Sequence, residues 1–226
     1  MEKDNNEENS RRNFLAGAGL VTAGAAMLAS SNAAAQANSG FNPERHDEDA
    51  WMEIDSKHRV FVDSSSGPGG IQGINYASNI LRAHAMGYNG KDSDYSIILC
   101  FRHDSSPFGF NSAMWEKYHE LFMRRTQATN ADGSPVTVNP LTVESSPYGN
   151  RSNTVANMAE RGVHFAICNL STLGMAGGLA RATGKTSEEV YAELIANTVP
   201  NGQIVPAGVM ASTRAQEFGY TYMYSA

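Results

Sequence analysis

Short apolar runs alternate with helix-type patterns along most of the chain. Two nearly continuous apolar runs, at residues 95–101 and 163–168, are typical of strands buried in a parallel sheet. Three shorter patterns complete the series, so that the predicted strands span residues 57–63, 95–101, 163–168, 203–205 and 220–224. Apolar positions at helical spacing predict helices between successive strands. Strands that alternate with helices predict an α/β fold, here one doubly wound, mostly parallel sheet of about five strands.

The predicted strands and helices occupy residues 57–226, and the chain ahead of them has a different character. Residues 38–56 are polar and mixed, which predicts a loosely packed linker anchored by Trp51 and Met52. Within the domain, residues 126–150 interrupt the alternation with several Pro, Gly and Asn residues. A long loop inside a compact domain is usually functional or covers a partner subunit, and the role of this one is left open.

The first 37 residues have the features of an export signal. Residues 10–15 (Ser-Arg-Arg-Asn-Phe-Leu) resemble a twin-arginine motif, and Ala16 stands where that motif usually has Lys. A Gly- and Ala-rich apolar run follows, too short for a stable membrane span, and small residues predict cleavage after residue 37, with residues 33–35 as a rival site. We therefore expect a signal peptide at residues 1–37, recognised by the twin-arginine export machinery, and a periplasmic mature protein. The alternative is a chance Arg pair before an apolar helix.

Composition and charge narrow the range of partners. The 226-residue chain is 41% hydrophobic and 18% charged, with a net charge of −6 and a pI of about 5.5. Lys and Arg are scattered, so the chain has no basic field that would attract nucleic acid, and no nucleic-acid partner is expected. The two cysteines are too few for a disulfide scaffold, although one pair can bridge in an oxidising compartment.

The sequence contains no established signature for a cofactor or a metal. The glycine-rich segment at residues 64–70 fails both phosphate-binding fingerprints, because Gln72 stands where a dinucleotide pattern needs its third Gly and no Gly-Lys-Ser/Thr is present. Six histidines show no HxxxH or HExxH spacing. No cofactor and no metal site is therefore predicted, although backbone donors at residues 64–70 could bind a small anion.

The predicted strand at residues 163–168 ends on Cys168, and a turn of small and polar residues leads directly into a helix. In open α/β sheets, ligands and reactive groups gather at the carboxyl ends of the strands. A helix N-terminus also lowers the pKa of a nearby thiol, because its partial positive charge favours the thiolate. Cys168 is therefore the candidate nucleophile. The alternative is a buried structural cysteine, since free Cys is among the most buried residue types.

Arg102 and His103 follow the predicted strand at residues 95–101, so we expect them at the same edge of the sheet as Cys168. Either side chain could steady a thiolate or an anionic substrate, and His103 could also move protons near neutral pH. The structural alternative is an Arg that caps loop carbonyls beside a solvent-facing His. Cys100 lies inside the apolar run and is interpreted as a core cysteine, because a redox pair with Cys168 would need Cα atoms within roughly 7 Å.

Several segments together resemble the DsrE/DsrF-like family, in its exported branch that carries a twin-arginine signal. The resemblance covers roughly residues 57–226 and rests on residues 161–163 (Arg-Gly-Val), 167–173 (Ile-Cys-Asn-Leu-Ser-Thr-Leu), 199–202 (Val-Pro-Asn-Gly), 204–209 (Ile-Val-Pro-Ala-Gly-Val), 215–222, 102–103, 107–108 and 111–115. It implies a flavodoxin-like sheet, a tendency to form homo-oligomers and a motif cysteine at Cys168. In sulfur-relay members of the superfamily the corresponding cysteine carries a persulfide. Those members work in the cytoplasm beside partner subunits, whereas this chain has the features of an exported protein.

Two functions from different classes follow from these observations. The first is an exported DsrE-like protein that uses Cys168 in sulfur relay or thiol-redox chemistry, on a small sulfur compound or a partner thiol. Arg102, His103 and Asn169 would then line the site. The second is a non-catalytic module that binds a small ligand or assembles into a homo-oligomer, with a structural cysteine. Whether the protein is an enzyme is left open.

Overall fold

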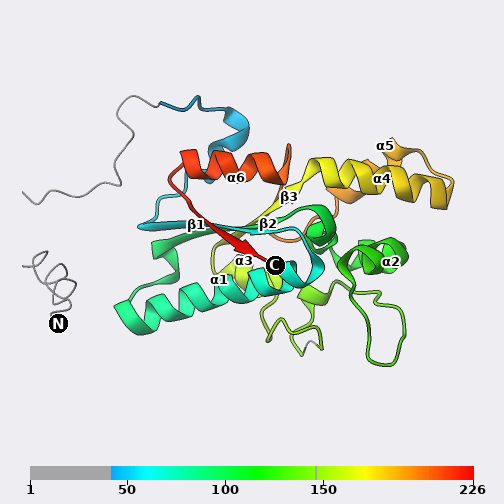
Figure 1. Ribbon diagram of the computed structural model, residues 1–226, viewed down its shortest axis with the longest axis horizontal. Helices are drawn as coiled ribbons and strands as arrows, with labels where there is room; N and C mark the ends of the chain where they lie inside the picture. The colour runs from blue at the N-terminus through cyan, green and yellow to red at the C-terminus, as the bar shows by residue number, and fades with distance from the viewer. Residues whose placement is uncertain (1–41, 146) are drawn as a thin grey trace, which may run out of the picture. The chain divides into compact units, whose positions relative to one another are not determined.

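The computed structural model describes residues 42–145 and 147–226, of which Glu44–Ala226 belong to one compact unit (Figure 1). The predicted signal peptide, at residues 1–37, lies outside the described residues. Within the described ranges, no helix is both long enough and apolar enough to cross a membrane.

Five strands form a parallel sheet in the order β4-β3-β2-β1-β5. The strands are β1 (His58–Ser64), β2 (Tyr95–Phe101), β3 (Val163–Cys168), β4 (Gly202–Val205) and β5 (Thr221–Ser225). Their bounds agree with the predicted ranges to within one residue. The three central strands are short, mostly apolar runs that the sheet buries, whereas four of the five residues of β5 are exposed. The predicted α/β fold is confirmed as an open, flavodoxin-like parallel sheet with helices on both faces.

Helices connect the strands along the whole described chain. The α-helices are α1 (Gly67–Tyr88), α2 (Ser112–Thr126), α3 (Val155–Glu160), α4 (Asn169–Thr183), α5 (Ser187–Ile195) and α6 (Gly208–Glu217). Short 3₁₀ helices accompany them: η1 (Asp47–Met52), η2 (Asp92–Asp94), η3 (His103–Gly109) and η4 (Pro140–Thr142).

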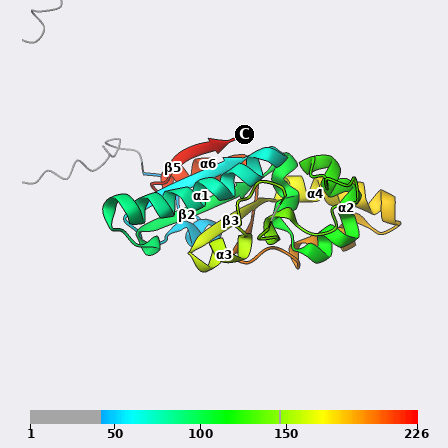
Figure 2. The ribbon, with the colours of Figure 1, turned by 90° about the horizontal axis from the view of Figure 1, so that it is seen from below.

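The direction of each step across the sheet decides which face its helices cover. From β1 to β4 the chain moves strand by strand toward one edge, and α1 and α3 lie below the sheet in Figure 1. The connection from β4 to β5 returns across the sheet in the opposite direction. Because crossovers between parallel strands are right-handed, this reversal puts α6 on the other face. Figure 2 views the first face, where α1 contacts β1 and β2, and α3 contacts β3.

Each face of the sheet has its own hydrophobic core, and residues of one strand alternate between the two. In β2, Leu99 and Phe101 belong to the larger core, which also takes residues from α1 to α5. Ile98 and Cys100 belong to the smaller core, under α6 and η1. The alternation follows from the period of two residues along a strand. Residues that share a face can therefore be assigned by their parity.

The helix α1 begins at Gly67, four residues before the first apolar position of the predicted helix. The side chain of Ser66 accepts a hydrogen bond from the N–H of Gly69 at 2.9 Å, and Pro68 supplies a helical φ in the first turn. Glycine is needed for close approach, because a Cβ on Gly67 would lie 1.8 Å from the carbonyl oxygen of Thr126. The start of α1 therefore packs directly against the end of α2.

Residues 44–56, expected as part of a loose linker, are packed against the α6 side of the domain. Met52 is fully buried in the smaller core, as its predicted anchoring role requires, and its carbonyl oxygen accepts a hydrogen bond from the hydroxyl of Tyr220 at 3.0 Å. The guanidinium of Arg45 lies 3.9 Å from the centroid of the Phe218 ring. This packing differs from the expected loose linker because a single α-helix leaves part of this face uncovered, and η1 buries the remainder.

The long segment between α2 and α3 has little regular structure, yet its path is defined. It follows Thr126, as expected, and η4 is its one helical turn within the described residues. Asn139 is fully buried and donates hydrogen bonds from Nδ2 to the carbonyl oxygens of Phe108, at 2.9 Å, and Phe110, at 2.7 Å. Val136 is buried as well. The loop is therefore attached to the end of the larger core.

Candidate functional site

Cys168 is the last residue of β3 and the N-cap of α4. Its residue is 6% exposed, and its thiol has no hydrogen-bond partner in the described part of the chain. Ala166, two residues earlier, belongs to the smaller core, so parity puts Cys168 on the α6 face as well. The thiol thus lies at the carboxyl edge of the sheet, nearly but not completely covered.

The start of α4 provides a favourable electrostatic environment for an anion at Cys168. The first turn of this 15-residue helix contains no acidic side chain, and within residues 42–145 and 147–226 no side chain caps its backbone N–H groups. The partial positive charge at a helix N-terminus attracts anions. Asn169 is the first helical residue, and its Oδ1 atom is buried without a hydrogen-bond partner among the described residues.

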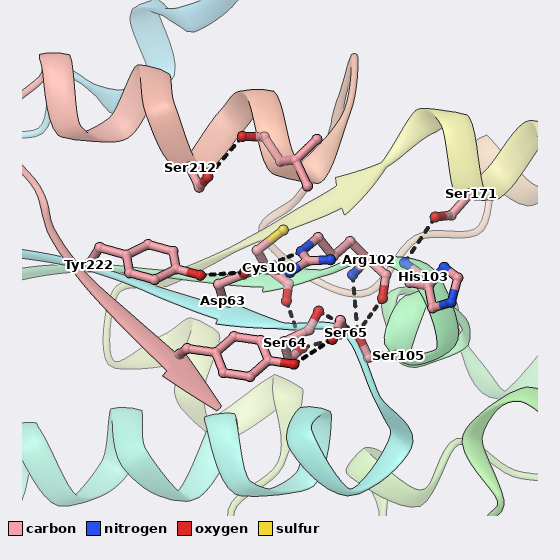
Figure 3. A network of polar contacts seen from close by, with 12 residues as sticks. Asp63, Ser64, Ser65, Cys100, Arg102, His103, Ser105, Ser171, Ser212 and Tyr222 are labelled. Atoms are coloured by element: carbon pink, nitrogen blue, oxygen red, sulfur yellow. Dashed lines mark hydrogen bonds and ion pairs between the residues drawn. The ribbon is translucent and has the colours of Figure 1, made fainter. Parts of the chain in front are cut away.

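Arg102, directly after β2, forms a two-pronged ion pair with a buried carboxylate (Figure 3). Its Nε and Nη2 atoms donate to Oδ1 and Oδ2 of Asp63, both at 2.8 Å. The side chain of Asp63 is 3% exposed, and Oδ2 also accepts a hydrogen bond from the Tyr222 hydroxyl at 2.7 Å. Hydrogen bonding to Asp63 raises the pKa of Arg102 above its usual range, while burial and the same carboxylate raise the pKa of Tyr222 to about 12. The guanidinium is therefore permanently charged and held in one orientation.

The backbone of Arg102 is held by serines that end β1 and begin η3. The N–H of Arg102 donates to the Ser64 carbonyl at 3.2 Å and to Ser105 Oγ at 3.0 Å. Ser64 Oγ in turn donates to the carbonyl oxygen of Cys100 at 2.7 Å. Figure 3 shows these side chains gathered between β1 and η3. The network orients the first residue beyond β2 by its main chain as well as its side chain.

The structure brings Arg102 and Cys168 to the same level of the sheet. The last paired residues of β2 and β3 are Phe101 and Ile167, and the next residue on each strand is Arg102 and Cys168, respectively. Arg102 comes two residues after Cys100, and Cys168 comes two residues after Ala166. Both of these earlier residues belong to the core on the α6 face, so Arg102 and Cys168 are on that face as well. Arg102 Nη1 makes no hydrogen bond within the described residues, and the Arg102 side chain is 22% exposed. The guanidinium itself is directed toward Asp63 on β1, on the other side of β2 from Cys168.

His103 is placed differently from the other predicted site residues. Its backbone has a φ of 53°, its N–H donates to Ser171 Oγ at 2.9 Å, and its imidazole is 71% exposed. The ring lies 3.7 Å from the carboxylate of Asp104. The main chain of His103 therefore joins η3 to α4, whereas the imidazole faces solvent, as in the structural alternative for this residue.

Cys100 lies in the smaller core and is fully buried. Burial, followed by the neighbouring charges of Asp63 and Cys168, raises the pKa of its thiol well above the usual range. In the pairing of β2 with β3, Cys100 lies opposite Ala166, and Cys168 is two residues further along β3. Regular parallel strands then separate the two cysteine Cα atoms by about 8 Å. This exceeds the roughly 7 Å that a disulfide allows, so both cysteines are free, and the core interpretation of Cys100 agrees with its position.

Sequence reasoning missed Asp63 and Tyr222, which hold the guanidinium of Arg102. Asp63 ends the predicted first strand, and that position alone was a signal that its side chain would lie near the carboxyl edge of the sheet. No comparable signal exists for Tyr222, because its contact depends on β5 pairing with β1. In the described part of the chain, no group of three or more His, Cys, Asp or Glu side chains is placed to hold a metal ion.

No protein-family model and no curated protein matches the chain. Among solved structures, it is similar to the protein of unknown function MTH1491 from Methanobacterium thermoautotrophicum, at 14% sequence identity and a TM-score of 0.35. That alignment covers 74% of this chain and 98% of the other. The fold assignment rests on the sheet itself, and the site on its own geometry.

Proposed function

We propose that the protein is an exported thiol protein that accepts and passes on sulfane sulfur at Cys168. The observation that supports this most directly is the position of the thiol, at the carboxyl end of β3 and the uncapped start of α4. Arg102 follows the neighbouring strand β2 at the same level, and its guanidinium is paired with Asp63. The resemblance to the DsrE/DsrF-like family points to the same residue.

The proposed step is a transfer between sulfur atoms that needs no external oxidant. The Cys168 thiol loses its proton to solvent, and the thiolate attacks the outer sulfur of a persulfide or polysulfide donor. The donor S–S bond breaks as the new S–S bond forms, and the donor leaves as a thiolate or a shorter polysulfide. The cysteine persulfide that results is an anion, which the α4 N-terminus stabilises. Transfer to a partner thiol reverses these steps.

The small exposed fraction of Cys168 limits the size of a sulfur donor that can reach its thiol. The residue is 6% exposed, compared with 0% for Cys100, so a small inorganic polysulfide reaches it more readily than a bulky reagent. We expect native labelling by a large maleimide to be slow and polysulfide modification to be fast. Cys100 is expected to react with neither until the protein unfolds.

The test is mass spectrometry of the reduced protein after incubation with inorganic polysulfide. A single adduct of one sulfur atom, about 32 Da, is expected in the wild type and in Cys100→Ser, and no adduct in Cys168→Ser. Treatment with a thiol reductant should remove it. The proposal fails if the folded wild type takes up no sulfur, or if Cys168→Ser takes up as much as the wild type.

The export route is part of the same proposal. Replacing Arg11 and Arg12 together by Lys is expected to leave the precursor in the cytoplasm, because the export machinery reads the arginine pair. Cell fractionation with an antibody to the protein measures this. Normal export of the double variant would contradict the twin-arginine interpretation.

A homo-oligomeric assembly module is the second candidate, and a group of exposed apolar residues favours it. They come from α4, α6 and β5: Leu170 (64% exposed), Leu173 (46%), Val209 (59%), Met210 (46%), Tyr222 (46%), Met223 (37%) and Tyr224 (47%). β5 is also an edge strand whose five residues carry no charge, no Pro and no Gly. Natural edge strands usually carry charged residues or Pro, which prevent pairing with another chain.

This second candidate predicts that β5 takes part in self-association. Met223→Lys introduces a charge at the uncharged edge and is expected to lower the mass of the particle in solution. Multi-angle light scattering after gel filtration measures that mass. Met86→Lys is the matched control, because Met86 is 75% exposed on α1. A monomeric wild type, or equal masses for all three proteins, would exclude assembly through β5.

A further inference from the structure

A cleft of about 670 Å³ lies between the start of α1, the end of α2 and the segment that leads into α3. Clefts of this size hold small organic molecules in many proteins. Its lining includes Ile71 and Gln72 of α1, Gln127 after α2, and Tyr148 and Arg151 of the long segment. None of the residues assigned to the Cys168 site lines it. The cleft is therefore a separate feature of the molecule.

The cleft coincides with the point where the sheet topology reverses. β2, β3 and β4 are added on one side of β1, whereas β5 is added on the other. Pro68, four residues beyond β1, and Ala226, directly after β5, both line the cleft. Figure 1 marks the C-terminus beside the start of α1, and Ser225 Oγ donates to the carbonyl oxygen of Gly69 at 2.7 Å. In open α/β sheets, ligands bind outside the carboxyl ends of the strands at such a switch point.

Hydrogen bonds from α1 hold one wall of the cleft in place. Asn75 is 2% exposed and donates from Nδ2 to the carbonyl oxygen of Gly149 at 2.9 Å. Its Oδ1 accepts a hydrogen bond from Asn153 Nδ2 at 2.8 Å. These bonds attach the residues on either side of Arg151 to a long helix. The wall is thus formed before any ligand arrives, as is usual for small-molecule sites.

The residues of the wall define the chemistry of an occupant. Among the described residues, the cleft lining contains one cationic side chain, Arg151, and no Asp or Glu side chain. The guanidinium of Arg151 makes no hydrogen bond or ion pair within the described residues, and its backbone has a φ of 53°, in the left-handed region. Ile71, Pro147 and the ring of Tyr148 add apolar surface. An unpaired guanidinium beside apolar groups suits a ligand with a negative end and an apolar body.

We propose that this cleft binds a small organic anion, with a carboxylate, sulfonate or phosphate paired to Arg151 and a flat apolar body packed against Ile71 and Tyr148. The site is independent of Cys168 in this proposal. Loss of one charge-assisted hydrogen-bonding partner weakens binding by about tenfold or more.

The experiment titrates the full protein with 2-naphthoate and with neutral 2-naphthalenemethanol, by calorimetry and by amide chemical shifts. Saturable naphthoate binding is expected, with the neutral compound at least about tenfold weaker. Arg151→Gln should weaken naphthoate binding by about the same factor and leave the neutral compound unchanged. Arg181→Gln is the matched control, because Arg181 is exposed on α4 and outside the cleft. Shifts should centre on residues 147–151 and the first turns of α1.

Several results would overturn the proposal. The first two are the absence of saturable naphthoate binding and an affinity for the neutral compound equal to that for naphthoate. The other two are an equal loss of naphthoate affinity in Arg151→Gln and Arg181→Gln, and amide chemical-shift changes centred on β5 or α4. Arg151→Gln should melt at the wild-type temperature, because its side chain has no partner to lose. Cys168→Ser should bind naphthoate like the wild type, so that failure here and failure of the sulfur proposal are separate outcomes.

Discussion

At the scale of single residues, Asp63 controls what Arg102 can do. The carboxylate is buried, and it is satisfied by two guanidinium nitrogens and the Tyr222 hydroxyl. A buried charge that loses its partner is costly, because neither water nor another group replaces the interaction. The orientation of the Arg102 side chain, toward β1 and β5, therefore depends on a residue from a different strand.

We expect Asp63→Asn to lower the free energy of unfolding by about 3 kcal/mol, because Arg102 loses its counter-charge. Tyr222→Phe removes one hydrogen bond from a partly exposed hydroxyl and should cost about 1 kcal/mol. Urea denaturation followed by circular dichroism measures both values. Equal stability of Asp63→Asn and the wild type would show that the ion pair contributes nothing to folding.

His164 in β3 makes stability depend on pH. Its ring lies 6.2 Å from the Trp51 ring, and its Nδ1 atom is buried without a partner among the described residues. Burial lowers the pKa of His164 below its ordinary value of 6.5. The folded state therefore binds a proton less readily than the unfolded state, so the free energy of unfolding falls as the pH drops below about 6.5.

His164→Phe should flatten this dependence, because Phe retains a ring against Trp51 and does not titrate. The measurement is the denaturation midpoint in urea at several values between about pH 7 and pH 5. A wild-type slope equal to that of the variant would assign the pH dependence to other groups.

At the scale of elements, the start of α6 is fitted closely to the end of β2. A Cβ on Gly208 would lie 2.6 Å from Cβ of Arg102 and 3.0 Å from Sγ of Cys100. Figure 3 shows the sulfur of Cys100 directed toward the α6 side of the sheet. Glycine at this position lets the helix approach the strand and covers the buried thiol.

Gly208→Ala is therefore expected to destabilise the protein by about 1–2 kcal/mol through overpacking. Gly174→Ala in α4 is the control, because a Cβ there meets nothing within 4 Å. That control should be neutral or stabilising by up to about 1 kcal/mol, since Ala favours a helix over Gly. The same denaturation experiment applies, and a Gly208→Ala protein as stable as the control would contradict the close fit.

At the scale of the whole molecule, the chain from residue 44 completes the smaller core. α6 is the single α-helix on that face within the described residues, and η1 covers what it leaves open. We expect Met52→Ala to cost about 3 kcal/mol, because Met52 is fully buried. Met86→Ala, at an exposed position, should change stability by less than about 0.5 kcal/mol. Thermal and urea denaturation measure the stability of both variants. If Met52→Ala is as stable as Met86→Ala, the segment that contains Met52 does not contribute to the core.

The positions of the strands were predictable because short apolar or alternating patterns mark them, and each strand ends within one residue of its predicted bound. The location of Arg102, Cys168 and Asn169 at one edge of the sheet was predictable as well, since residues that follow parallel strands meet there. Prediction was less accurate where distant parts of the chain interact. The start of α1 depends on the cap at Ser66 and on contact with Thr126, which apolar periodicity does not report.

The sequence by itself determined the α/β class, the strands and the edge of the sheet at which Cys168 and Arg102 lie. These features depend on local patterns of apolar and polar residues, which can be recognised along the chain without knowledge of the fold. Tertiary structure alone decided that β5 pairs with β1, that Asp63 and Tyr222 hold Arg102, and that His103 faces solvent. It also decided that Cys100 and Cys168 are two residues out of register. The physical reason is that strand order and register come from contacts between residues far apart in the chain, which local patterns do not encode.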